Sequence, residues 1–175
     1  MKRCYGGVNM EDYFTKKNMK PILDVLHALK GIEQQVEYHP EGDALKHTYQ
    51  VFKWAIRETM DLDLILAVLL HDVGKVTYSN HHTKDSVKLI EGFSSCKTVW
   101  LVKHHMRIWT YLKGEMQGLK KCLELANHCW LPDLIQLARW DAKGRNPRSQ
   151  CYFTDEQIIE ILNRKAREHF DKGVI

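Results

Sequence analysis

The sequence predicts an all-α fold, and three observations carry this prediction. Apolar residues recur with helical spacing through most of the chain, helix-capping residues precede these stretches, and no run of alternating β-branched residues indicates a strand. The composition, with 44% hydrophobic and 27% charged residues, is typical of a globular protein and argues against extended disorder. We therefore expect a single domain, a compact helical bundle that spans residues 1–175.

The N-terminal half contains three predicted helices. Asn18 can cap the first, whose apolar stripe runs from residue 22 to residue 29 and which Gly31 would close. Asp43 follows the turn-rich segment EYHPEGD and can cap the second, whose apolar residues at 51, 54, 55 and 60 line one side. The third, LDLILAVLLHDV, is apolar on almost every side, so it should lie at the centre of the molecule and end at Gly74.

The C-terminal half continues the helical pattern. The segments TKDSVKLIEGF and SCKTVWLVKHHMR read as a pair of helices joined near Ser94, and residues 114–128 carry a weaker helical signal. The segment LPDLIQLARWDAKGR has a proline suited to a first helical turn and should end at Gly144. Thr154 and Gln157 form a candidate capping box that opens an amphipathic helix within residues 154–171.

Composition also limits the cellular setting and the class of partner. The longest apolar run, residues 64–70, is too short to span a bilayer, and the N-terminus lacks the apolar core of a signal peptide. The five cysteines are odd in number and contain no C-x-x-C pair, so we expect a cytoplasmic protein without disulfides or a membrane partner. A net charge of +4 suits a phosphate-bearing ligand, or simply a basic surface, and is too small for a polybasic nucleic-acid binder.

Four residues on separate predicted helices have side chains that bind divalent metals. His47 lies on the second helix, His71 and Asp72 end the central helix, and Asp141 ends LIQLARWD. Two imidazoles and two carboxylates suit Mn, Fe, Co, Ni, Zn or Mg better than a thiolate-binding metal. Neighbouring helical residues point about 100° apart, so the adjacent pair can grip one ion only where the helix ends. That end also carries partial negative charge, which favours a cation.

Further residues can extend this site. Lys75, one turn after His71, is placed to meet an anion bound to the metal. His82, His104 and His105 can supply ligands for a second ion, about 3.5–4 Å from the first and bridged by Asp72. In a one-ion site these histidines would instead act as general acids or phosphate contacts. The candidate catalytic residues are Asp72, Lys75, His104 and His105.

Several histidines and cations have ordinary structural explanations as well. A single histidine is more often a structural or surface residue than a ligand, and His27, His128 and His169 fit helix surfaces. His39, before Pro40 in a turn, could face either way, and we include it among the candidate substrate contacts. The basic cluster beside Asp141 is either a solvated helix end or a phosphate-binding site, and its members are Arg139, Lys143, Arg145 and Arg148.

These motifs resemble the signature of the HD-domain phosphohydrolase superfamily. The likeness runs from about residue 39 to residue 148 and is strongest to the HD domains of bacterial tRNA nucleotidyltransferases, in the segments YHPEGDALKHTYQVF, AVLLHDVGK, HHTKDSVKLI and LARWDAKGR. The resemblance implies an all-helical fold with metal ligands His47, His71, Asp72 and Asp141, and with Lys75 and Arg145 as phosphate contacts. In members that hold two ions, later histidines complete the second site, where this chain has His82, His104 and His105.

The resemblance implies a metal-dependent phosphoric ester hydrolase with one or two divalent ions. The expected substrates are 2′,3′-cyclic phosphates and phosphomonoesters of nucleotides or RNA ends, attacked by metal-activated water. One alternative is a nucleotidase or deoxynucleoside triphosphate hydrolase, and another is a nucleotide- or RNA-binding module without turnover. Because no nucleotidyltransferase region precedes the motifs, we expect the hydrolytic chemistry without necessarily the RNA partner. The natural substrate, the metal, the oligomeric state and the pathway stay open.

Overall fold

The computed structural model describes residues 13–171 and confirms the all-α prediction. Within this range the secondary structure is helical, apart from an isolated bridge between Glu33 and Asp43. The helices are α1 (Lys16–His27), α2 (Ala44–Glu58), α3 (Leu62–Leu70), the 3₁₀ helix η2 (Val73–Thr77), α4 (His82–Ile90), α5 (Cys96–His104), α6 (Arg107–Leu112), α7 (Leu119–Ala126), α8 (Leu131–Lys143) and α9 (Asp155–Asp171). None of these described helices is both long and apolar enough to cross a membrane.

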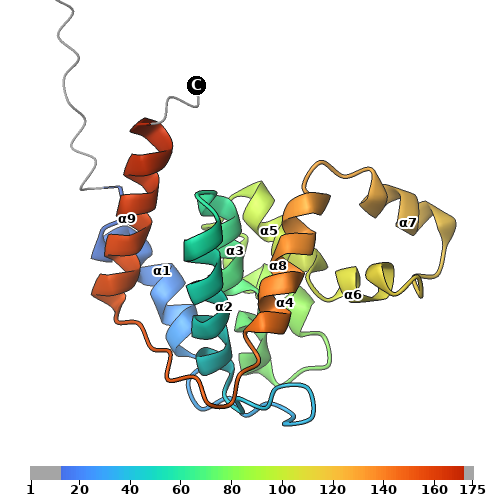
Figure 1. Ribbon diagram of the computed structural model, residues 1–175, viewed down its shortest axis with the longest axis horizontal. Helices are drawn as coiled ribbons and strands as arrows, with labels where there is room; N and C mark the ends of the chain where they lie inside the picture. The colour runs from blue at the N-terminus through green and yellow to red at the C-terminus, as the bar shows by residue number, and fades with distance from the viewer. Residues whose placement is uncertain (1–12, 172–175) are drawn as a thin grey trace, which may run out of the picture.

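Helix α3 forms the centre of the molecule, as its sequence predicts. It packs against α2 and α5, and more lightly against α1, α8 and α9. Figure 1 shows α1 and α9 at one side of the bundle and α7 projecting from the opposite side. The buried residues of α3 are Leu64, Ile65, Ala67, Val68, Leu69 and Leu70. Because each fully buried leucine or isoleucine contributes about 1.5–3 kcal/mol, this short helix anchors the core and fixes the position of the residues that follow it.

The end of α3 differs from the prediction. The α-helix stops at Leu70 instead of continuing to Gly74, and a 3₁₀ helix begins at Val73 after His71 and Asp72. The backbone of Gly74 does not have a positive φ, so the turn itself does not require a glycine here. It is needed because of close packing: a Cβ at this position would lie 2.0 Å from the backbone oxygen of His82.

The caps of the N-terminal helices are partly as predicted. The prediction that Asn18 caps the first helix is wrong, because Thr15 is the N-cap and Asn18 is the third helical residue. The two form a capping box, in which Thr15 N donates to Asn18 Oδ1 at 2.7 Å and Asn18 N donates to Thr15 Oγ1 at 3.3 Å. The N-cap at Asp43 is confirmed, because its Oδ1 accepts from the Lys46 backbone at 2.8 Å.

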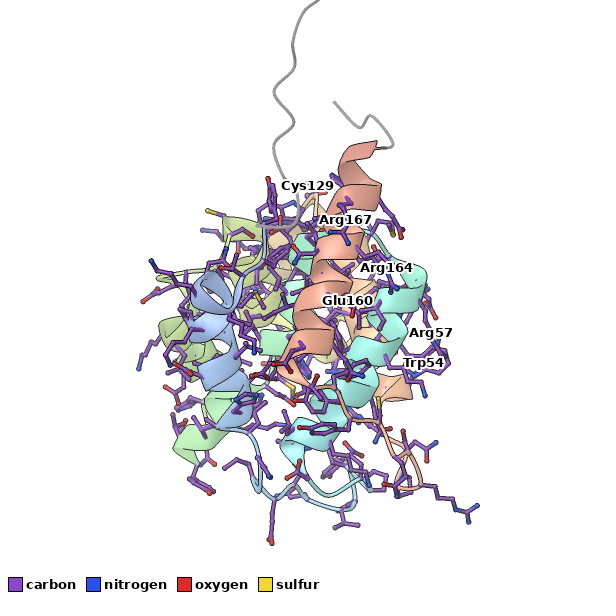
Figure 2. All side chains as sticks on the ribbon, turned by 90° about the vertical axis from the view of Figure 1, so that its left-hand side faces the viewer. Trp54, Arg57, Cys129, Glu160, Arg164 and Arg167 are labelled. Atoms are coloured by element: carbon purple, nitrogen blue, oxygen red, sulfur yellow. The ribbon has the colours of Figure 1, made fainter. Side chains whose placement is uncertain are left out.

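Helix α9 covers the side of the bundle formed by α1. The predicted capping box is confirmed, since Thr154 N donates to Gln157 Oε1 at 2.9 Å and Gln157 N donates to Thr154 Oγ1 at 3.3 Å. The buried apolar side chains recur every four residues and are Ile158, Leu162 and Ala166. Figure 2 shows polar side chains on the outward side of α9, among them Glu160 and Arg164. The amphipathic prediction for this segment therefore holds.

The end of α8 is held tightly against α2. A Cβ at Gly144 would lie 2.5 Å from Val51 Cγ2, so only glycine permits this approach. Beyond it, Gln50 Nε2 donates to Asn146 O at 2.9 Å, and Asn146 N donates to Gln50 Oε1 at 3.1 Å. These contacts fix the last turn of α8, which carries Asp141, beside the turn of α2 that carries His47.

Lys97 joins three helices through a partly buried ion-pair network, and its removal should destabilise the protein. Its ammonium group contacts Asp61 and lies 2.7 Å from Asp133, with 16% of the side chain exposed. Burial opposes its charge, but Asp133 and Asp61 raise the pKa of Lys97, so the pair persists at neutral pH. We expect Lys97→Met to lower the free energy of unfolding by about 1–3 kcal/mol, because it leaves two aspartates unpaired.

Urea denaturation at pH 7 checks this expectation. Lys88→Met is the matched control, because Lys88 is 75% exposed and its contact with Asp85 is 3.5 Å long. Exposed pairs of this kind contribute about 0–1 kcal/mol. Equal unfolding midpoints for the two variants would show that the Lys97 network does not stabilise the fold.

Candidate metal centre

His71 and Asp72 lie at the C-terminal end of α3, buried under η2 and α4. His71 is the C-cap residue of α3, and its Nδ1 is 2.7 Å from the carbonyl oxygen of Val68. A carbonyl can only accept, so Nδ1 carries a hydrogen, and Nε2 is the ring nitrogen left to face a ligand. That Nε2 lies 3.3 Å from Asp72 Oδ2. The local end of the helix therefore orients both groups of the pair toward one point.

His47 and Asp141 come to the same place from two other helices. His47 is fully buried in the first turn of α2, and its Nε2 lies 3.1 Å from Asp141 Oδ1 in the last turn of α8. The ring centroids of His47 and His71 are 5.6 Å apart. One ligand atom from each of His47, His71 and Asp141 lies within 4.8 Å of the other two, a spacing at which the three could hold one metal ion.

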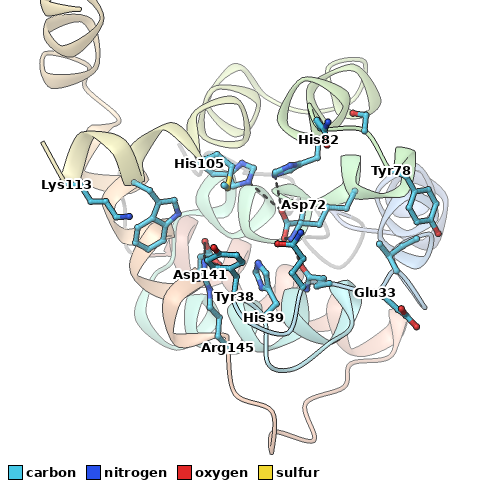
Figure 3. A pocket seen from close by; sticks show the side chains of 18 residues that line it. Glu33, Tyr38, His39, Asp72, Tyr78, His82, His105, Lys113, Asp141 and Arg145 are labelled. Carbon is cyan, nitrogen blue, oxygen red and sulfur yellow. Dashed lines mark hydrogen bonds and ion pairs between the residues drawn. The ribbon is translucent and has the colours of Figure 1, made fainter. Parts of the chain in front are cut away.

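Asp72 is also the centre of a second group of potential ligands. Its Oδ1 lies 3.7 Å from Nε2 of His82, the first residue of α4, and 3.6 Å from Nε2 of His105, which follows α5. Figure 3 shows both histidines pointing toward Asp72 from separate helices. His105 is oriented as His71 is, with its Nδ1 2.6 Å from the carbonyl oxygen of Val102. These three residues form a second set with ligand atoms within 4.8 Å of one another.

The ring nitrogens that face these two groups have no hydrogen-bond partner. They are Nε2 of His47, His71, His82 and His105, and each is buried. An unpaired buried polar atom costs about 1–3 kcal/mol, so four in one place call for an explanation. All four converge on two ionised carboxylates, and nitrogen and oxygen atoms in this arrangement are a complete ligand set for divalent cations. The residues present thus fit a divalent metal ion.

The electrostatics of the site favour carboxylates that are ionised. Burial by itself would raise the pKa of Asp72, but His71 and Lys75 hold it well below its usual value. Burial likewise opposes ionisation of Asp141, and His47 lowers its pKa nonetheless. Burial lowers the pKa of His82 to about 4, so this imidazole is neutral at pH 7. Both carboxylates and His82 are therefore in the protonation state that metal ligation requires.

His47 behaves differently from His82. Burial would lower its pKa, but the carboxylates of Asp141 and Glu41 raise it to about 9. In the ion-free protein His47 thus carries a charge that balances its two acidic neighbours. A cation between His47 and Asp141 would replace that proton.

A cavity of about 830 Å³ opens onto both ligand groups. Asp72, His82, His105 and Asp141 line it, together with three cations, Lys75, Lys113 and Arg145. Lys75 Nζ lies 2.6 Å from Asp72 Oδ2, and Arg145 Nη2 is 3.2 Å from both carboxylate oxygens of Asp141. Figure 3 shows His39 and Arg145 on one side of this cavity and His82 and His105 on the other. Positive side chains therefore surround the place where an anionic group would meet the metal ligands.

The structure brings most of the predicted site residues together and leaves one outside. The residues that converge are His47, His71, Asp72, His82, His105 and Asp141, and those that line the cavity beside them are His39, Lys75 and Arg145. His104 lies outside the site. Its ring packs against the ring of Trp100, and the two ring centroids are 4.6 Å apart. Neighbouring residues at the end of α5 point about 100° apart, so only His105 of this pair can face the cavity.

Two residues in the loop before α2 belong to the site but were not singled out in the sequence. Glu41 is buried between His39 and His47, with its Oε1 3.0 Å and 2.7 Å from their Nδ1 atoms. Gln34 accepts a hydrogen bond from Lys75, while its own buried Nε2 has no partner. Neither residue has a periodic spacing relative to the predicted ligands, so no signal in the sequence marked them.

The helical fold and the buried histidines and aspartates at one cavity place this chain among the α-helical domains that have a histidine–aspartate metal centre. The family model for the HD domain matches residues 44–129. This match identifies residues 44–129 of the chain as an HD domain.

Similar proteins have the name Multifunctional CCA protein. One, from Methylobacillus flagellatus, is 30% identical over 167 residues, which cover 82% of this chain and 40% of that protein. Others, from Burkholderia cenocepacia and Burkholderia mallei, are 28% identical over 88% of this chain and 42% of their own length. The chain thus spans about two-fifths of the length of these relatives.

Proposed function

We propose that this protein hydrolyses phosphate esters of nucleotides or RNA ends, with 2′,3′-cyclic phosphates and phosphomonoesters as substrates. The observation that carries the proposal is that two ligand groups, Lys75 and Arg145 meet at one cavity. The cavity volume of about 830 Å³ falls in the range of pockets that hold whole small molecules, roughly 300–1,000 Å³, so it has room for a nucleotide. The resemblance of the sequence motifs to the HD domains of tRNA nucleotidyltransferases supports an RNA end as one form of substrate.

In this proposal each ligand group holds one divalent ion. His47, His71 and Asp141 would hold the first, and Asp72, His82 and His105 would hold the second, with Asp72 close to both. When bound, the ions supply Lewis acidity toward the phosphoryl oxygens and lower the pKa of water. The mixed nitrogen and oxygen ligands favour Mn, Fe, Co, Ni or Zn, and Mg is compatible with the carboxylates.

The remaining residues of the cavity would bind and orient the substrate. Lys75 is held by Asp72 and Gln34, so its ammonium group has a fixed position from which to pair with a phosphate oxygen. Arg145 can offer its guanidinium beside Asp141, which spreads the negative charge that develops in the transition state. His39 lies on the cavity wall and would contact the leaving part of the substrate. Asp72 would accept the proton of the attacking water.

A panel of substrates tests the reaction. Protein freed of metal and reloaded with Mn²⁺, Co²⁺ or Ni²⁺ should hydrolyse 2′,3′-cyclic AMP and release phosphate from a 3′-monophosphate faster than it cleaves a deoxynucleoside triphosphate. A preference for 5′-monophosphates or triphosphates would favour the alternative, a nucleotidase or deoxynucleoside triphosphate hydrolase. Tight nucleotide binding without turnover with any of these metals would identify a binding module and refute the proposed hydrolysis.

Metal binding should also stabilise the fold in a way that heat denaturation can measure. The ions would pair the four buried nitrogens, and a ligand at one hundred times its dissociation constant adds about 2.7 kcal/mol to the free energy of unfolding. For a domain of this size, that corresponds to a rise in Tm of about 5–10 °C on adding Mn²⁺ to chelator-treated protein. The His71→Ala variant should lose most of this rise, and a full rise in that variant would contradict the assignment of His71.

A further inference from the structure

Glu41 is a buried carboxylate whose neighbours are two histidines. Its side chain is 0% exposed, and its Oε1 is 3.0 Å from His39 Nδ1 and 2.7 Å from His47 Nδ1. The contact with His39 is a hydrogen bond, whereas the contact with His47 is a short ion-pair contact without hydrogen-bond alignment. Burying a carboxylate costs several kcal/mol, and no lysine or arginine of the described residues pairs with Glu41. The contacts with the rings of His39 and His47 therefore explain why this carboxylate is buried.

The loop that carries Glu41 is fixed by its own backbone. Gly42, with φ of +81°, turns the chain directly after Glu41, in the left-handed conformation that favours glycine. Its N–H donates to His39 O at 2.9 Å, and its carbonyl accepts from Gln34 N at 2.9 Å. Asp43 then caps α2, which carries His47 one turn later. The carboxylate is thus held against His47 by a rigid connection.

The distance to Glu41 decides which nitrogen of His47 carries a hydrogen. An anionic oxygen at 2.7 Å from Nδ1 would meet a lone pair unfavourably, so Nδ1 must carry the hydrogen. When a cation replaces the second proton of His47, the lone pair is then confined to Nε2, the atom that faces Asp141 at 3.1 Å. The same argument applies to His39, whose Nδ1 donates to Glu41 and whose ring lines the cavity. One carboxylate oxygen therefore sets the tautomer of two rings.

We infer that Glu41 is a positioning residue that keeps His47 Nε2 directed at the metal centre and orients the ring of His39 toward the substrate. The inference rests on the proposed function, because it assigns His47 to an ion. The carboxylate acts from behind the ring, as acidic partners of metal-bound histidines do, and loss of such a partner typically weakens metal affinity about 10–100-fold. The rings of His39 and His47 are 4.7 Å apart at their centroids, so Glu41 links the ion side of the cavity with the substrate side.

Calorimetric titration of chelator-treated protein with Mn²⁺ tests the inference without an activity assay. Glu41→Ala should bind Mn²⁺ about 10–100-fold more weakly than the wild type. Glu41→Gln should show a smaller loss, because its carbonyl oxygen can still accept from Nδ1 but carries no charge, and it also serves as the test if Glu41→Ala does not fold. Glu37→Ala is the matched control, since Glu37 is an exposed glutamate of the same loop, and it should bind as the wild type does.

A double substitution separates positioning from general stability. If Glu41 acts through the ring of His47, Glu41→Ala should have no further effect on Mn²⁺ affinity in a His47→Ala background. Wild-type affinity in Glu41→Ala, or an additive loss in the double variant, would overturn the inference and leave the proposed function standing. A wild-type protein that binds no Mn²⁺, Co²⁺ or Ni²⁺ would overturn the proposed function, and the inference with it.

Discussion

Asp72→Asn should lower kcat/KM for phosphate ester hydrolysis by a factor on the order of 10³. Asp72 lies between the two ligand groups: its Oδ2 is 3.3 Å from His71, and its Oδ1 is within 3.7 Å of His82 and His105. Asparagine keeps the shape of the side chain but removes the negative charge, and its amide hydrogens would repel a cation. Steady-state kinetics with 2′,3′-cyclic AMP and Mn²⁺ measure the loss.

Two measurements distinguish loss of the metal centre from loss of the fold. Asp24→Asn is the control for activity, because Asp24 is 58% exposed and, among the described residues, its carboxylate pairs only with Lys20 one turn away. Circular dichroism should show that Asp72→Asn is folded, since asparagine carries no charge that must be buried. An Asp72→Asn variant with wild-type kcat/KM would show that this carboxylate takes no part in the reaction.

Local signals in the sequence predicted most of the fold. Apolar spacing placed the central helix, and Asp43, Thr154 and Gln157 act at the helix ends as their residue types indicate. Asn18 was misplaced because asparagine serves both as an N-cap and as the third residue of a capping box. The choice between these two roles depends on where the preceding chain enters, which the residue types alone do not determine.

The site was predictable where a helix end fixes a side chain. His71 and His105 each follow a helix and each donate from Nδ1 to the carbonyl oxygen three residues earlier, so one local device orients both rings. His104 turns away because it is the last residue of α5, one position before the C-cap residue His105. This local hydrogen bond from Nδ1 distinguishes His105 from His104 by position relative to the end of α5 alone.

Loop residues were not predictable in this way. Glu41 and Gln34 reach the site because the chain folds back over the start of α2, through the hydrogen bond between Gln34 N and Gly42 O. That approach depends on a left-handed glycine and on tertiary contacts, neither of which produces a periodic pattern. Residues that support a site from a loop therefore appear only when the fold is known.

Gly74→Ala should destabilise the protein by about 3 kcal/mol or more, at or above the upper end of the range for overpacking. A Cβ at residue 74 would lie 2.0 Å from the backbone oxygen of His82 and 2.4 Å from the backbone nitrogen of Ser86. Both are backbone atoms of α4, so relief requires that α4 move away from η2. Such a shift would break the 2.8 Å hydrogen bond from Gly74 N to Ser86 Oγ and carry His82 away from Asp72.

Thermal denaturation of the ion-free protein measures this cost, which corresponds to a fall in Tm of about 6–12 °C for a domain of this size. Gly92→Ala is the matched control, because a Cβ at that exposed position meets nothing within 4 Å. Its effect should stay within about 0.5 kcal/mol, since alanine also reduces the entropy of the unfolded chain. Because the clash displaces a proposed ligand, Gly74→Ala should also bind Mn²⁺ more weakly where it remains folded. Equal stability of the two alanine variants would show that α4 does not pack on η2 as closely as the distances require.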